Sequence, residues 1–230
     1  MADTIVPQHV GFIVDGNRRW AKERGKPTFL GHKTGFDKLK EIMDYTHERG
    51  VKYVTAFIFS TENWDRSKEE VKYLIDLYRD LFTKEVKRLH EKNVRVNILG
   101  HNDGLAPDII KMTKEGEDLT KNNTKAVASF CFNYGGEWEL AEACKQICKS
   151  GIDPDTLTPE VIKQHLYHPE VPKMDMLVRT SGEQRISGFM LYRAAYSELM
   201  FLKKYWPDME KSDVDDIIAE YQRRNRRFGK

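Results

Sequence analysis

The chain alternates short apolar runs with longer stretches of helical periodicity, and this alternation restricts its fold more than any other feature. Short apolar runs between turn residues are typical of buried strands, and apolar residues at helical spacing are typical of amphipathic helices. Strands that alternate with helices favour right-handed crossovers and a parallel sheet. We therefore expect an α/β fold with a central, mostly parallel sheet flanked by helices. The predicted strands are 9–14, 53–59, 94–99, 126–132 and 174–178, and the predicted helices are 34–49, 67–93, 107–119, 137–149 and 212–225.

Length and composition fit one domain that spans residues 1–230. Hydrophobic residues make up 40% of the chain and charged residues 32%, and no repeat, linker or composition break divides it. The formal net charge of +2 is too small for a general nucleic-acid-binding surface, so any anion site must be local. Three cysteines without the spacing of a disulfide framework favour a reducing compartment. With neither a signal peptide nor a membrane span in the sequence, we expect a cytoplasmic protein that contacts membranes only peripherally.

The loop after the first predicted strand carries one carboxylate, Asp15, a glycine and two arginines, Arg18 and Arg19. In an open parallel sheet, ligands bind outside the carboxyl ends of the strands. Arginines at a helix start suit a phosphate, and a lone aspartate suits Mg²⁺ that also takes substrate oxygens. The alternative interpretation is an aspartate cap beside solvated arginines, and the spacing alone does not separate the two.

Two further loops carry polar groups to the same predicted edge. Residues 60–66 follow the second strand and place Trp64 among hydrogen-bonding side chains, where it is either a site residue or a core plug. Residues 179–187 follow the fifth strand and hold two arginines and two serines around a glycine; alone they would suit a solvated loop. Together, several arginines and one or two carboxylates predict a site for two polyanions bridged by a divalent cation. Glu198 is either the second carboxylate or a helix-end charge.

The predicted helix 67–93 begins at a capping box, in which Ser67 accepts the backbone N–H of Glu70 and the Glu70 side chain reaches back. Its apolar residues form one stripe that either packs an ordinary core or faces a hydrophobic channel. The stripe consists of Val71, Leu74, Ile75, Tyr78, Phe82, Val86 and Leu89.

The chain resembles the cis-prenyltransferases, the family of undecaprenyl and dehydrodolichyl diphosphate synthases, from His9 to Gly229. The order of several specific motifs makes a chance resemblance implausible. The motifs are Asp15-Gly16-Asn17-Arg18-Arg19-Trp20-Ala21, Gly31-His32-Lys33, Phe59-Ser60-Thr61-Glu62-Asn63-Trp64, Asn133-Tyr134-Gly135-Gly136, Arg179-Thr180-Ser181-Gly182-Glu183, Arg185-Ile186-Ser187, Tyr196-Ser197-Glu198-Leu199, Trp206-Pro207 and Arg226-Arg227-Phe228-Gly229.

The resemblance implies a Mg²⁺-dependent enzyme that condenses isopentenyl diphosphate with an allylic diphosphate and loses a proton. It implies that Asp15 binds the Mg²⁺, that Glu198 completes the metal site, and that Asn63 accepts the proton. It also implies a homodimer in which residues 227–229 (Arg227, Phe228 and Gly229) reach the partner's site. The implied ligands of the allylic diphosphate are Gly16, Asn17, Arg18, Arg19 and Trp20, with His32 beside the leaving diphosphate. Ser60, Thr61, Glu62, Trp64 and Arg66 would hold the reacting centres, and Arg179, Arg185, Ile186 and Ser187 would grip isopentenyl diphosphate.

A growing hydrocarbon chain needs a dry channel, so the resemblance favours a hydrophobic tunnel between the sheet and the long helices. Ile58, Phe130 and Phe132 are bulky, and we expect them to plug this tunnel and to limit product length. The chain departs from the family pattern at four positions. These departures do not include the metal aspartate, so we expect them to change substrate preference or affinity. At Thr28 the family usually has an arginine, and nearby Lys26 is a candidate replacement. The four positions are Thr28, Glu137, Gln184 and Gly188.

Five alternatives are weaker. Asp213-Val214-Asp215-Asp216 lacks the spacing of a trans-prenyl synthase motif and suits a helix N-terminus, and Asn17 replaces the second aspartate of a haloacid-type phosphatase. Cys144 and Cys148 are more simply explained as buried thiols than as metal ligands. A catalytically reduced lipid-binding partner subunit would not need the catalytic residues that are present. A basic C-terminal RNA-binding tail lacks interleaved aromatic residues.

Overall fold

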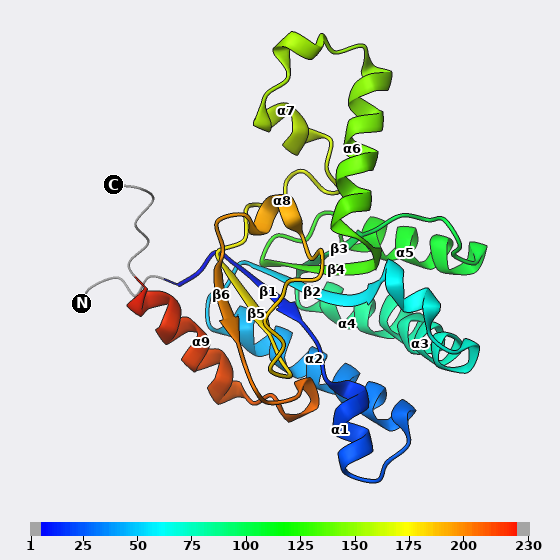
Figure 1. Cartoon of the computed structure of the whole chain (residues 1–230), viewed down its shortest axis with the longest axis vertical. Helices are drawn as coiled ribbons and strands as arrows, with labels where there is room; N and C mark the ends of the chain where they lie inside the picture. Colours follow the sequence, from blue (N-terminus) through cyan, green and yellow to red (C-terminus); the bar gives the residue numbers. More distant parts are fainter. Residues whose placement is uncertain (1–5, 225–230) are drawn as a thin grey trace.

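The computed structural model describes residues 6–224, and its centre is one sheet of six parallel strands (Figure 1). The strand order is β3-β4-β2-β1-β5-β6, and each neighbouring pair is parallel. The expected α/β fold is therefore confirmed. The strands are β1 (His9–Ile13), β2 (Tyr53–Ser60), β3 (Val94–Leu99), β4 (Ala126–Tyr134), β5 (Met176–Arg179) and β6 (Glu198–Phe201).

Helices connect the strands and cover the sheet. They are α1 (Asn17–Glu23), α2 (Thr28–Glu48), α3 (Lys68–Asp80), α4 (Val86–Glu91), α5 (Pro107–Thr120), α6 (Gly136–Ser150), α7 (Pro159–Gln164), α8 (Leu191–Ala194) and α9 (Lys211–Arg223). Short 3₁₀ turns are η1 (Thr61–Asp65), η3 (Pro154–Thr156) and η4 (Trp206–Asp208), and η2 (Leu81–Glu85) is a π-helical turn that joins α3 to α4.

One predicted boundary is wrong and one strand was missed, each for an identifiable reason. Helix α2 begins at Thr28 after Pro27, not at Thr34, whose hydroxyl donates to the Leu30 carbonyl inside the helix. Gly31 and Gly35, which weaken a helix prediction, allow α1 to approach α2 closely, because a Cβ at Gly31 would lie 2.1 Å from a backbone oxygen of α1. Strand β6 was not predicted, because a four-residue edge strand gives little periodicity.

The two faces of the sheet pack against different layers. The side chains of Val10 and Phe12 join a large core with α2, α3, α4 and α9, while Ile13 and Phe57 join a smaller core with α8 and the segment around Phe189. Successive strand residues point to opposite faces, so one strand serves both cores. Since both faces are covered, the exposed polar groups of the sheet concentrate at the ends of the strands.

Helices α6 and α7 project from the body of the molecule (Figure 1). Cys144 and Cys148 lie exposed on α6, so the expectation that they are buried thiols is wrong; this helix meets solvent on most of its surface. Within residues 6–224, no helix combines the length and the apolar character that a bilayer crossing needs.

Candidate active site

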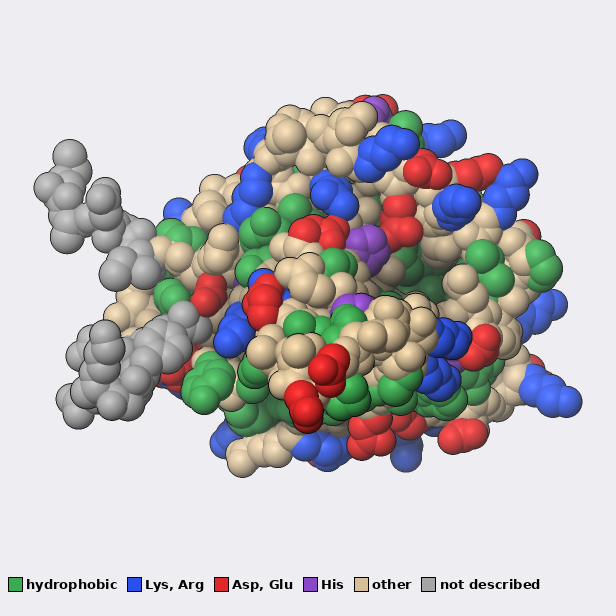
Figure 2. All heavy atoms as spheres, turned by 90° about the horizontal axis from the view of Figure 1, so that it is seen from above, with side chains coloured by type: hydrophobic (Ala, Val, Ile, Leu, Met, Phe, Trp, Pro, Cys, Tyr) green, Lys and Arg blue, Asp and Glu red, His purple; other side chains and the backbone are tan. Residues whose placement is uncertain are grey.

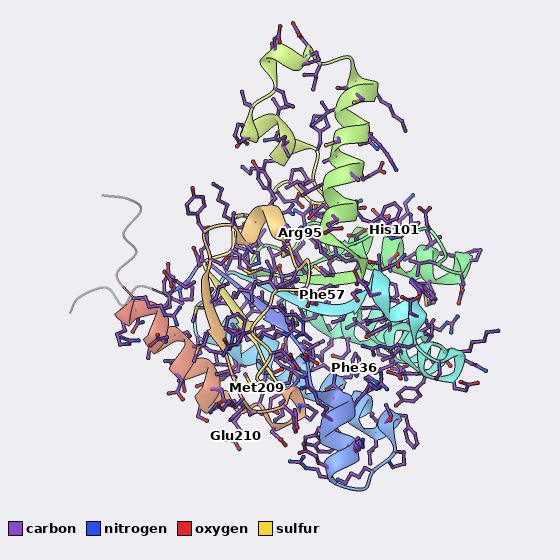
Figure 3. All side chains as sticks on the ribbon, viewed as in Figure 1. Phe36, Phe57, Arg95, His101, Met209 and Glu210 are labelled. Carbon is purple, nitrogen blue, oxygen red and sulfur yellow. The ribbon has the colours of Figure 1, made fainter. Side chains whose placement is uncertain are left out.

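A cavity of about 1100 Å³ opens at the carboxyl ends of β1, β2 and β5. The three loops that the sequence places at this edge all contribute to its wall, so the predicted convergence is confirmed. The cavity has a polar part near the strand ends and an apolar part between the sheet and α2 and α3. Figure 3 labels Phe36 of α2 and Phe57 of β2, which line it from a helix and from the sheet.

Asp15 and Arg179 form the centre of the polar part. Arg179 is only 4% exposed, and its Nη2 donates to Asp15 Oδ2 at 2.9 Å while its Nη1 donates to Ser187 Oγ at 2.8 Å. Asp15 Oδ1 also accepts the backbone N–H of Gly16 at 2.7 Å. Burial raises the pKa of Asp15, but hydrogen bonds from Arg179 and Ser181 outweigh it and leave this pKa below its ordinary value. Asp15 is therefore ionised at neutral pH.

Gly16 fixes the direction in which the chain leaves Asp15. Its φ of +104° lies in the left-handed region, and a Cβ there would lie 2.6 Å from the ring of Tyr205. The turn directs α1 along the cavity, so that Arg19 Nη2 donates to Ser181 Oγ at 2.6 Å and lies 3.4 Å from Asp15 Oδ2. A glycine is needed here for both reasons.

A second group of basic side chains surrounds Glu70 on α3. Glu70 Oε1 lies 3.2 Å from His32 Nε2 and 3.0 Å from Arg66 Nη1, and Glu70 Oε2 lies 3.7 Å from Arg18 Nη1. These three basic side chains line the cavity, whereas Glu70 lies behind them. Burial lowers the pKa of His32 more than Glu70 raises it, so its pKa lies below the ordinary value and the ring is neutral at neutral pH.

Glu70 is a site residue that the sequence interpretation missed. Half of the predicted capping box is confirmed, because Ser67 Oγ accepts the Glu70 N–H. The other half is wrong, because the Glu70 carboxylate turns to His32 and Arg66 instead of the cap. A reciprocal capping pair instead joins Ser60 and Asn63 across η1.

The apolar part of the cavity runs along α2 and α3. Ile58 is part of its wall, but Phe130 and Phe132 are not: Phe132 packs behind Phe59 and Tyr78 in the core. Of the three residues that we expected to plug the tunnel, only Ile58 lies at the cavity surface. The apolar wall includes Phe36, Leu39, Ile58, Phe59, Leu74, Leu77 and Tyr78.

Most predicted site residues lie in the wall of the cavity. They are Asp15, Gly16, Asn17, Arg18, Arg19, His32, Ser60, Thr61, Glu62, Asn63, Arg66, Arg179, Arg185 and Ser187. Three predicted substrate ligands are not part of the wall. Trp20 donates from Nε1 to Asp208 at 2.6 Å, Trp64 donates to Asn133 at 2.8 Å, and Ile186 packs on the smaller core.

Glu198 does not meet Asp15 within one chain. It opens β6 and lies level with Met176 and, one strand further, with Val10, whereas Asp15 follows the other end of β1. Five residues along a strand correspond to roughly 16 Å. The Glu198 carboxylate instead accepts from Arg224 Nη1 at 3.0 Å. A single chain therefore does not form the predicted two-carboxylate metal site.

The donor set nevertheless fits a Mg²⁺ ion that is held by one carboxylate and by substrate oxygens. Mg²⁺ commonly takes one or two carboxylates, with phosphate oxygens and water completing its shell. Asp15 supplies an ionised carboxylate in the cavity wall, and within residues 6–224 no cluster of three or more His, Cys, Asp or Glu side chains forms an all-protein cage. The buried Nε of Arg179 has no hydrogen-bond partner in the part of the chain that the structure describes, as expected beside a site for an anion.

Other predictions meet the structure in different ways. Residues 227–229 lie outside the described residues. Asp213 accepts the Glu210 N–H at 2.7 Å at the start of α9, which agrees with the expectation that this acidic segment suits a helix N-terminus. The described part of the basic tail, Arg223 and Arg224, pairs with Glu220. Figure 2 shows acidic and basic side chains intermixed on the face seen from above.

Comparison with known proteins extends over the whole fold. Residues 13–229 match the Prenyltransf family model, described as undecaprenyl diphosphate synthase. The chain is 46% identical over 226 residues to an isoprenyl transferase of Thermotoga maritima, with 97% of each protein covered. It is 43% identical to a tritrans,polycis-undecaprenyl-diphosphate synthase (geranylgeranyl-diphosphate specific) of Pyrococcus abyssi, with 98% of this chain and 88% of that protein covered.

A solved structure shows the same similarity in three dimensions. The crystal structure of lavandulyl diphosphate synthase from Lavandula x intermedia in complex with dimethylallyl diphosphate superposes with a TM-score of 0.94 at 31% identity. The superposition covers 99% of this chain and 100% of the other. The shared architecture therefore includes all the elements that form the cavity.

Proposed function

The chain belongs to the undecaprenyl diphosphate synthase family and is a prenyl-transferring enzyme, and on this premise we propose that it condenses isopentenyl diphosphate with an allylic diphosphate primer. The product would be a Z-polyprenyl diphosphate. The observation that carries the proposal is an ionised aspartate, Asp15, held between Arg19 and Arg179 where a polar cavity becomes apolar. Diphosphates and isoprenoid tails are the two chemistries that such a cavity suits.

The reaction begins when the allylic C–O bond breaks and leaves negative charge on the departing diphosphate. Arg18 and Arg19 bind this diphosphate from α1, and neutral His32 lies beside it. Fixed donors stabilise the developing charge most in the transition state, so they raise the rate more than the affinity. Asp15 would hold Mg²⁺, which supplies further positive charge at the departing oxygens.

Isopentenyl diphosphate binds on the other side of Asp15. Arg185 and Ser187 hold its diphosphate, and buried Arg179 adds a fixed charge that links this side to Asp15. The double bond then attacks the allylic carbon, and Asn63 accepts the proton that is lost. Asn63 lies in the cavity wall and is oriented by Ser60 through their reciprocal hydrogen bonds.

The apolar part of the cavity would take the growing chain as a hydrophobic tunnel. Ile58 and Leu39 line it from β2 and α2, and their bulk favours a product of limited length. Burial of methylene groups stabilises the elongated intermediate by about 0.8 kcal/mol each, so tunnel depth and product length should change together.

We further propose a homodimer in a reducing, cytoplasmic compartment, with peripheral membrane contact when the lipid product leaves. Since one chain keeps Glu198 away from Asp15, a metal-binding role for Glu198 requires a site shared with a second copy. Residues 227–229 are proposed to reach that shared site. Mixing Asp15→Asn protein with Glu198→Gln protein tests this: recovered turnover supports a shared site, and purely additive loss opposes it.

The direct test is incubation with labelled isopentenyl diphosphate, Mg²⁺ and allylic primers of increasing length, with products separated by chromatography. Elongated lipid with at least one primer is expected, and its loss on adding a chelator would establish the metal requirement. If no primer is elongated but a labelled polyprenyl diphosphate still binds, the chain is instead a lipid-binding partner subunit of the same fold.

A further inference from the structure

Glu183 joins two arginines that belong to different parts of the cavity wall. Its Oε1 accepts from Arg19 Nη1 at 2.9 Å, and its Oε2 accepts from Arg185 Nη1 at 2.5 Å. Arg19 reaches this point from α1, after β1, and Arg185 from the loop after β5. One carboxylate therefore connects loops that are more than 160 residues apart in the sequence.

The Glu183 carboxylate supports the arginines from outside the cavity. Arg19 and Arg185 both line the cavity, whereas Glu183 does not. Each ion pair uses one terminal nitrogen of its guanidinium, and Arg185 keeps Nε and Nη2 for another partner. Glu183 can therefore retain Arg185 while the free edge of that guanidinium binds phosphate oxygens.

The two arginines depend on Glu183 to different degrees. Arg19 also donates to the carbonyl and hydroxyl oxygens of Ser181 and approaches Asp15. Within residues 6–224, the Arg185 guanidinium has hydrogen bonds to Glu183 alone, and this side chain is 60% exposed. A long exposed side chain loses considerable rotamer entropy when a ligand fixes it, unless another group has already ordered it.

We propose that Glu183 is a positioning residue that orders Arg185, relative to Arg19, for binding the diphosphate of isopentenyl diphosphate. The inference rests on the proposed function, because that function assigns the two arginines to two diphosphates. Glu183 touches neither diphosphate and acts through Arg185. The bridge also keeps the two diphosphate sites at a fixed separation before either substrate arrives.

Glu183→Gln removes the charge and preserves the size of the side chain. An exposed ion pair changes an equilibrium by up to about five-fold, so the KM for isopentenyl diphosphate should rise by about that factor. The KM for the primer should rise by less than about two-fold, because Arg19 keeps its other partners, and kcat should stay within about two-fold. The matched control is Glu160→Gln, which breaks an exposed pair with Lys163 on α7 and should change neither KM.

A double-variant comparison separates positioning from a general change of charge. If Glu183 acts through Arg185, Glu183→Gln should add nothing to the KM of an Arg185→Gln enzyme. An additive rise would overturn the proposal. So would a lower KM in Glu183→Gln, because it would mean that the carboxylate competes with the substrate.

Titration calorimetry with inorganic pyrophosphate in the absence of Mg²⁺ supplies a readout that needs no turnover. The dissociation constant of pyrophosphate should rise in Glu183→Gln by about the same factor as the KM for isopentenyl diphosphate. It should not change in Glu160→Gln. An unchanged constant in Glu183→Gln contradicts the bridge. If the wild-type enzyme elongates no primer, the proposed function fails, while this titration still decides the role of Glu183.

Discussion

Replacing Asp15 by asparagine tests the centre of the proposed site with the smallest change of shape. The substitution preserves an oxygen that can accept the Gly16 N–H but removes the negative charge between Arg19 and Arg179. It also removes the one carboxylate in the cavity wall that we assign to Mg²⁺. The expected result is a large loss of kcat in a protein that still folds.

The magnitude follows from the contacts of Asp15. Removing one preorganised electrostatic group from an active site typically costs about 10²–10³ in kcat, or about 3–4 kcal/mol. Folding should lose less. Breaking a fully buried ion pair costs about 3–5 kcal/mol, but the Asp15 side chain is 29% exposed, so solvent screening reduces the cost to about 1–2 kcal/mol. This corresponds to a decrease in Tm of only a few degrees for a chain of this size.

The assay combines initial rates at saturating substrates and Mg²⁺ with thermal unfolding followed by circular dichroism. Asp44→Asn is the matched control, because Asp44 accepts from Arg88 at 2.6 Å and from Lys92 at 2.7 Å, and none of the three lines the cavity. It should lose similar stability and keep its turnover. If Asp15→Asn retained more than about a tenth of wild-type kcat, the reasoning would be refuted.

Two further predictions concern product length and stability. Ile58→Ala should lengthen the product seen by chromatography, whereas Phe132→Ala should act mainly on folding, by about 3–5 kcal/mol, because Phe132 lies behind the cavity wall; equal lengthening by both variants would contradict this geometry. Burial lowers the pKa of His168, but hydrogen bonds to Glu117 and Glu170 outweigh it and raise it to about 9. Its contribution to stability is therefore complete below about pH 6.5 and lost as the pH rises through about 9. Urea unfolding should show His168→Gln less stable than wild type by about 1–3 kcal/mol at pH 6 and nearly equal at pH 10; a gap that does not change with pH would be inconsistent with this assignment.

The location of the site could be predicted because parallel strands deliver their carboxyl ends to one edge. That rule brings Asp15 and Arg179 together across 164 residues of sequence, and the structure places them 2.9 Å apart. The order of the strands was not needed for this step. The strand order is needed to place Glu198, because its distance from Asp15 depends on the register of β6. Register is a property of strand pairing, and a short edge strand does not encode it in its own sequence.

Side-chain direction was the other limit. Trp20 and Trp64 lie in the same short motifs as true cavity residues, but their indole N–H groups donate to Asp208 and Asn133, which lie outside the cavity wall. Those partners are distant in sequence, so membership of a motif predicted the loop correctly and the role of the tryptophan wrongly. The direction of the Thr34 side chain was also predicted wrongly. Its hydroxyl does not cap a helix but donates to the Leu30 carbonyl inside α2, because the helix has already begun at Thr28.

The carboxylates that hold the cavity cations were the least predictable part, although electrostatics requires them. Several guanidinium groups cannot be held close together in one fixed arrangement without negative charges between them, because like charges repel and exposed arginines are mobile. Asp15 and Glu183 each accept from two arginines, and Glu70 accepts from Arg66 and lies 3.7 Å from Arg18, so these carboxylates order the cations while each group keeps net positive charge. An acidic residue near a basic motif can either bind a metal or orient the neighbouring cationic side chains. Which of the two it does depends on whether its carboxylate faces the cavity. Asp15 faces it, whereas Glu70 and Glu183 lie behind the wall, which is why a metal role was assigned to the first and a positioning role to the last.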